Sequence, residues 1–164
     1  MPIYSTRLTN ALIEHKLEEH DMLKKVKRKV VKYGQHINLG CFRVEFIRTN
    51  HSIQDAAALA IYSPAGIVLH TGDFKVDYTP VFGDAIDLQR FGEIGKKGVL
   101  ALLCDSTNAE RPGFTDSEKS VGKTLDNIFS EHKNTRIIIA TFASNVDRVQ
   151  QIINSADKFG RKVA

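Results

Sequence analysis

The chain has 164 residues, of which 26% are charged and 42% hydrophobic, and its formal net charge is +4. These values are typical of a soluble globular domain that is large enough to bury a core. No apolar run approaches the roughly 20 residues that cross a bilayer, and the first residues lack the pattern of a secretion signal. Cys41 and Cys104 form no C-x-x-C pair, so we expect reduced cysteines and a cytoplasmic protein.

The first half of the chain predicts one helix followed by a series of strands. Leu12, Ile13 and Leu17 share one face of a helix predicted over residues 9–20, with Thr9 as a plausible N-cap. Alternating apolar and polar residues, and short apolar runs, indicate the strands that follow. These strands are predicted at residues 26–33, 35–39, 42–48, 56–62 and 66–70. The turn residues Ser63-Pro64-Ala65-Gly66 predict a hairpin between the last two.

The second half of the chain alternates helices with apolar strands. Helices are predicted at residues 88–94, 117–131 and 145–159, the second opened by Asp116 or Ser117. Buried strands are predicted at residues 99–104 and 136–141, where three isoleucines follow one another. The order of elements therefore indicates a mixed α/β protein.

A basic segment from Lys24 to Lys29, together with Lys32, carries much of the positive charge. One interpretation is an edge strand that lysines protect against pairing with other chains. The other interpretation is a surface for the phosphate backbone of RNA. The charge pattern alone does not separate these two interpretations.

Two groups that suit a metal ion follow neighbouring strands. His51 comes after the strand predicted at residues 42–48, and Asp73 comes after the strand predicted at residues 66–70. Imidazole and carboxylate are ligands for zinc or manganese, and a carboxylate has two oxygens with which to bridge a pair of ions. Gly72 would allow the tight turn that aims Asp73 outward. Taken singly, each residue could equally be a polar turn residue.

Two further polar clusters follow apolar strands. Asp105 directly follows the strand predicted at residues 99–104. A carboxylate at the end of a buried strand is expected to have a partner. Phe142-Ala143-Ser144-Asn145 precedes the last predicted helix. Amide groups at a helix N-terminus form a natural anion site, although Ser144 or Asn145 could also be an ordinary N-cap.

Four ordered motifs carry a resemblance to a known family. They are His51-Ser52-Ile53-Gln54-Asp55, Thr71-Gly72-Asp73-Phe74-Lys75, Cys104-Asp105-Ser106-Thr107-Asn108 and Ala140-Thr141-Phe142-Ala143-Ser144-Asn145. With the start at Tyr4-Ser5-Thr6-Arg7, they closely resemble ribonuclease J, of the β-CASP branch of the metallo-β-lactamase superfamily. The resemblance implies part of an αββα sandwich over residues 1–135, leading into the start of a β-CASP domain over residues 136–164.

The resemblance also implies an activity and residue roles. The family consists of metal-dependent ribonucleases, with endonuclease and 5′-to-3′ exonuclease action, in RNA processing and decay, rRNA processing included. His51 and Asp73 match metal-binding and catalytic positions, for two zinc ions or for Mn²⁺ or Mg²⁺. Ser52 and, less strongly, Asp55 would orient His51, and Asp105 would hold a histidine near the metals. Phe142, Ala143 and Ser144 match residues that contact RNA.

The chain also departs from the family. The six histidines, which are His15, His20, His36, His51, His70 and His132, include no His-x-His-x-Asp-His cluster. In the family this cluster lies upstream of the region that matches Met1, so we expect a fragment that is inactive alone. A non-catalytic RNA-contacting or scaffold segment, or another hydrolase of the superfamily, are the alternatives. RNA is the expected partner, with no membrane, and the family suggests a homo-oligomer for the longer parent.

Overall fold

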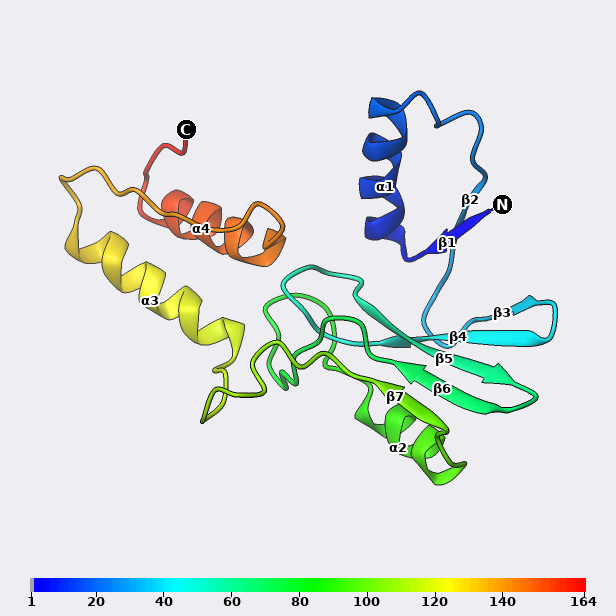
Figure 1. Ribbon diagram of the computed structural model, residues 1–164. Coiled ribbons are helices and arrows are strands. Elements are labelled where there is room, and N and C mark those ends of the chain that lie inside the picture. Colours follow the sequence, from blue (N-terminus) through cyan, green and yellow to red (C-terminus); the bar gives the residue numbers. More distant parts are fainter. Residues whose placement is uncertain (1) are drawn as a thin grey trace.

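The computed structural model describes residues 2–164, and its N-terminal unit is a helix between two short strands (Figure 1). Strand β1 (Ile3–Ser5) pairs in parallel with β2 (Arg28–Val30), and helix α1 (Arg7–Glu19) connects them. The helix starts two residues before the predicted one, with Thr6 rather than Thr9 as N-cap. Asp55, distant in sequence, accepts a hydrogen bond from the Leu8 amide at 3.1 Å, which satisfies a free N–H of the first turn.

A five-stranded sheet forms the centre of the molecule. Its strands are β3 (His36–Leu39), β4 (Phe42–Arg48), β5 (Ala57–Ser63), β6 (Gly66–His70) and β7 (Ala101–Leu103), in that spatial order. The first four strands are antiparallel neighbours, and β7 runs parallel to β6. Ser63 pairs with Gly66, which confirms the predicted hairpin.

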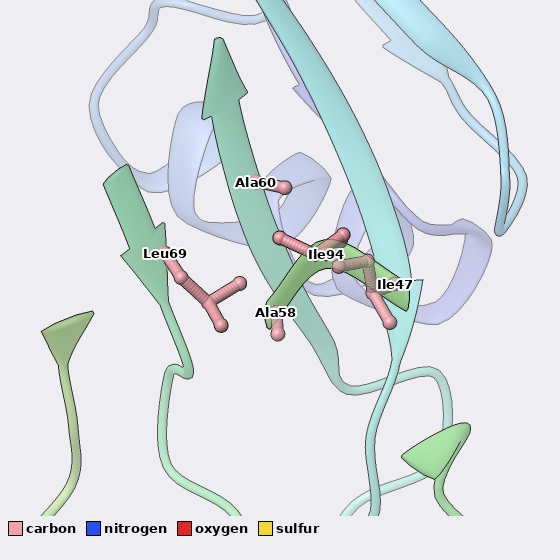
Figure 2. Close-up of a cluster of buried hydrophobic side chains, with 5 residues drawn as sticks. All are labelled: Ile47, Ala58, Ala60, Leu69 and Ile94. Atoms are coloured by element: carbon pink, nitrogen blue, oxygen red, sulfur yellow. The ribbon is translucent and has the colours of Figure 1, made fainter. Parts of the chain in front are cut away.

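Each face of this sheet buries its own apolar cluster, because successive side chains of a strand point to opposite faces. On one face, helix α2 (Leu88–Lys96) places Ile94 against Ile47, Ala58 and Leu69 (Figure 2). On the other face, Val44 and Phe46 pack with Val31, which follows β2. The sheet is thus covered on both sides, and its strand ends are held in place.

The last two helices form a hairpin beside the sheet (Figure 1). Helix α3 (Glu118–Glu131) begins after Ser117, whose side chain is its N-cap as predicted. Helix α4 (Val146–Lys158) packs against it. Asp126 of α3 accepts hydrogen bonds from Ser155 at 2.7 Å and from Lys158 at 2.6 Å, which joins the two helices away from the sheet.

The mixed α/β class is confirmed, but two predicted strands are wrong in burial or in kind. The strand at residues 99–104 shortens to β7 and is exposed, with Leu102 at 58%, because it lies at the edge of the sheet. Residues 136–141 form no strand, and Ile138 is 89% exposed. A strand needs a partner for its backbone groups, and none of residues 2–164 pairs with this segment.

Two observations bear on the surface. The lysines of the basic segment are exposed, while Arg28 bonds to Glu14 at 2.7 Å, so both interpretations of the segment stay open. Among the helices within residues 2–164, none is long and apolar enough to cross a membrane.

Candidate metal and RNA site

The turn that carries His51 follows β4 and is anchored from both sides. The Thr49 amide donates to the Ala56 carbonyl at 3.2 Å, which closes the turn. The side chain of Asn50 accepts from the Ile86 amide at 2.6 Å and donates to the Asp84 carbonyl at 2.9 Å. His51 is therefore presented from a loop whose neighbouring residue is fixed in two directions.

The turn that carries Asp73 follows β6 and is joined to the first turn. Gly72 has φ of 61°, a left-handed conformation that glycine adopts without steric cost, as its place beside Asp73 predicted. The Thr71 amide donates to the Leu103 carbonyl of β7 at 3.0 Å, and the Lys75 amide donates to the Asn50 carbonyl at 2.7 Å. This last bond ties the two turns together by their backbones.

The structure brings His51 and Asp73 together. The distance between His51 Nε2 and Asp73 Oδ2 is 3.9 Å, and both side chains are exposed. They line an open cavity of about 640 Å³, which Asp105 also lines. The donor types suit zinc. However, no three His, Cys, Asp or Glu side chains of residues 2–164 lie close enough together to hold a metal ion.

Asp105 enters this cavity as an ionised group. Hydrogen bonds from the Thr107 hydroxyl at 2.6 Å and the Thr107 amide at 2.9 Å lower the pKa of the Asp105 carboxyl. Its own amide donates to the Thr71 hydroxyl at 3.0 Å, which connects it to the Asp73 turn. The prediction that Asp105 holds a histidine near the metals is not tested by these contacts.

Ser52 and Asp55 have contacts other than the predicted ones. The Ser52 carbonyl accepts from the Asp147 amide of α4 at 3.4 Å. The Asp55 carboxylate accepts a hydrogen bond from the Leu8 amide in the first turn of α1. The supporting role of Ser52 stays a prediction.

The segment that carries Phe142, Ala143 and Ser144 is exposed, with Phe142 at 82%. The Asn145 amide donates to the Phe142 carbonyl at 2.9 Å, which closes a turn before α4. The N-cap is Asn145, whose side chain accepts from the Arg148 amide at 3.0 Å. Capping of α4 therefore does not use the Ser144 hydroxyl.

Comparison with known proteins decides the family. The chain is 51% identical to ribonuclease J of Synechocystis sp. over 99% of its own length, and 46% identical to ribonuclease J 1 of Streptococcus pyogenes over its whole length. A family model described as "Ribonuclease J, beta-CASP domain" matches residues 134–164. The chain belongs to the ribonuclease J family. The chain spans 25% of the length of the first relative and 29% of the length of the second.

A solved structure supports the fold. A protein of unknown function from Enterococcus faecalis has a TM-score of 0.66 to this chain at 20% identity, and the match covers 94% of this chain and 39% of that one. At this identity the likeness concerns the fold alone. The boundary predicted at residue 136 is not tested by these matches and stays a prediction.

A polar network that the sequence did not reveal joins the ribonuclease J motifs. The Lys75 ammonium lies 3.9 Å from the Asp77 carboxylate and 3.7 Å from the Glu118 carboxylate, so Lys75 pairs with both. Asp77 is buried, which acts to raise its pKa, but hydrogen bonds from the Glu118 amide, the Thr79 amide and the Ser117 hydroxyl outweigh this and lower the pKa. The only sequence signal was the charge of each residue, since the partners come from different elements.

The carboxyl of Asp147, unlike that of Asp77, has a raised pKa. Its side chain is 7% exposed and Oδ1 has no hydrogen-bond partner in the described residues. Burial raises the pKa of the Asp147 carboxyl, and the nearby charge of Glu118 adds to this. The first turn of α4 therefore includes a buried carboxylate with one oxygen that has no partner among the described residues.

Proposed function

We propose that this chain forms part of a metal-dependent ribonuclease of RNA processing and decay, with endonuclease and 5′-to-3′ exonuclease action. The observation that carries this proposal is the meeting of His51 and Asp73, 3.9 Å apart, on two turns that the Lys75–Asn50 backbone bond ties together. Family membership supports it, since the relatives bear the name ribonuclease J.

In this proposal, His51 and Asp73 are two of the ligands for a pair of ions, zinc or alternatively Mn²⁺ or Mg²⁺. Bound ions of this kind activate water and neutralise the charge that develops on a phosphodiester. The remaining ligands would come from outside these 164 residues, because zinc sites use three or four protein ligands. Asp105, held ionised by Thr107, would orient a further ligand from the same cavity.

RNA would be held by the segment before α4. The exposed ring of Phe142 suits stacking on a base, and the amides of Phe142 and Ala143 with the Ser144 hydroxyl suit a phosphate. The free Ser144 hydroxyl supports this role, since Asn145 provides the cap. We assign the 5′-phosphate end of the substrate to this segment.

We also propose that the chain by itself binds RNA without cleaving it, acts in the cytoplasm and belongs to a homo-oligomer in its longer form. The exposed, unpaired Cys41 and Cys104 fit a reducing compartment. The incomplete ligand set supports inactivity of the chain alone, because two ligands are fewer than a zinc site requires.

The test combines metal analysis with RNA cleavage, on this chain and on a chain extended to the length of its relatives, here called the extended protein. The extended protein should hold about two metal ions and cleave RNA, and this chain should bind no zinc tightly in a calorimetric titration. Cleavage by the extended protein after complete metal removal would overturn the metal proposal. A tight stoichiometric zinc site in this chain that His51→Ala abolishes would overturn the proposed inactivity.

A further inference from the structure

Glu118, the first residue of α3, lies between two cations that come from different parts of the molecule. One of its carboxylate oxygens accepts from Arg148 Nε at 2.6 Å, and the other lies 3.7 Å from Lys75 Nζ. The Glu118 side chain is only 18% exposed, so solvent screens these contacts less than those of a surface pair.

The two cations stand beside the candidate site. Lys75 follows Asp73 by two residues, and its amide donates to the Asn50 carbonyl next to His51. Arg148 lies in the first turn of α4, where its amide bonds to the Asn145 cap that follows Ser144. Glu118 therefore connects the two ligand-bearing turns with the RNA-contacting segment.

Polar contacts decide how the helical hairpin meets the sheet. Neither of the two apolar clusters of the sheet includes a residue of α3 or α4. The Glu118 amide donates to the buried Asp77 carboxylate at 3.0 Å, which fixes the start of α3 against the segment after Asp73. The Ser52 carbonyl and the Asp147 amide, 3.4 Å apart, make a second and longer connection to α4.

We propose that Glu118 is a positioning residue that sets the RNA-contacting segment relative to His51 and Asp73. This inference rests on the proposed function. A phosphate bound at residues 142–144 fixes the position of the RNA strand that follows it. The distance from this phosphate to His51 and Asp73 therefore determines which phosphodiester of the strand reaches these two residues. Loss of the Glu118 carboxylate frees the two sites to move relative to one another, although neither loses a group of its own.

Hydrogen exchange on this chain tests the connection directly, because the amides of Lys75, Asp147 and Arg148 are hydrogen-bonded at the junction. Glu118→Ala should speed their exchange by about tenfold, the effect of losing one hydrogen bond to a charged group. Asp126→Ala is the matched control, since Asp126 lies on the same helix and also joins α3 to α4, through Ser155 and Lys158. Unchanged exchange in Glu118→Ala, or equal acceleration in Asp126→Ala, overturns the proposal.

A double-mutant cycle separates this role from a general loss of stability. With Glu118 present, Lys75→Met and Arg148→Met should affect exchange of the Asp147 amide non-additively, because both act through one carboxylate. In a Glu118→Gln background, which keeps the size of the side chain and removes its charge, the two effects should become additive. Additive effects in the presence of Glu118 contradict the proposal.

Activity of the extended protein tests the consequence for substrate. The ratio of kcat/KM for 5′-monophosphorylated RNA to that for 5′-hydroxyl RNA should fall about tenfold in Glu118→Ala. The same ratio should stay at the wild-type value in Asp126→Ala. If the wild-type extended protein cleaves no RNA, the proposed function fails, while the exchange experiments still decide whether Glu118 connects the two regions. Faster exchange with an unchanged ratio overturns the positioning role.

Discussion

The two candidate functional regions of this chain are held in place by different kinds of contact. The turns of His51 and Asp73 are closed by backbone hydrogen bonds and supported by a sheet that is buried on both faces. The Phe142–Ser144 segment is exposed, closes with one backbone bond, and reaches the sheet through charged side chains. The position of the His51 and Asp73 turns is therefore set by the fold itself, whereas the position of the Phe142–Ser144 segment depends on a few polar contacts.

The largest expected effect concerns the turns of His51 and Asp73. Asp73→Ala in the extended protein should remove nearly all RNA cleavage and leave RNA binding measurable, because a metal-bridging carboxylate serves the reaction while basic and polar groups hold the strand. Cleavage rates and a binding titration check this. Wild-type cleavage by the variant would show that Asp73 is not a ligand.

The second prediction tests whether the core supports the ligand turns. Ile94→Ala removes a fully buried side chain beneath the sheet and should lower the free energy of unfolding of this chain by about 2–5 kcal/mol. Ile138→Ala, at an exposed position near the RNA-contacting segment, should change it by less than about 0.5 kcal/mol. Urea unfolding followed by circular dichroism measures both. Equal effects would contradict the contrast between the two regions.

A third, smaller effect concerns the Phe142–Ser144 segment. Ser144→Ala in the extended protein removes one hydrogen bond to a charged phosphate, worth about 1.5–3 kcal/mol, or about a tenfold to hundredfold rise in KM for 5′-phosphorylated RNA. The value of kcat should change much less, and some affinity should survive through the amides of Phe142 and Ala143. An unchanged KM would make Ser144 a residue without substrate contact.

The smallest effects come from two buried carboxylates of opposite character at the junction. The lowered pKa of Asp77 means that its contribution to stability is complete above its ordinary value of 3.8 and is lost as the pH falls through the lower folded value. Asp77→Asn should therefore destabilise the chain at pH 7, by about 1 kcal/mol for a carboxylate at a helix N-terminus.

Ionisation of Asp147 should change the stability of the chain in the opposite direction to ionisation of Asp77. Its raised pKa means that ionisation destabilises the fold at neutral pH, and that this penalty is relieved as the pH falls through the raised value. Asp147→Asn should raise the melting temperature at pH 7, and the gain should disappear at acidic pH. Thermal unfolding from pH 3 to pH 8 compares both variants with the wild type. A lower melting temperature for Asp147→Asn at pH 7 would mean that its carboxylate has a partner in solution.

Features set by neighbours in sequence could be predicted from the sequence. The strand Phe42–Arg48, the turn before Gly66, the Ser117 cap and the glycine beside Asp73 follow from local sequence, and each appears in the structure as predicted. The same reasoning placed His51 and Asp73 after two strands predicted to be neighbours, but these strands, β4 and β6, are separated by β5. Because both strands are antiparallel to β5, they run in the same direction and end at the same edge of the sheet, which brings the two turns together.

Only the tertiary structure decided features that depend on distant partners. The isoleucines at residues 136–141 have the pattern of a buried strand, but a strand forms only where another offers hydrogen bonds. Asp55 stabilises the first turn of α1 from 47 residues away, a contact that no local pattern indicates. The sequence around Glu118 likewise does not distinguish it from the other charged residues. Its importance arises because folding brings Lys75 and Arg148 to opposite sides of one carboxylate, and no local pattern specifies that meeting.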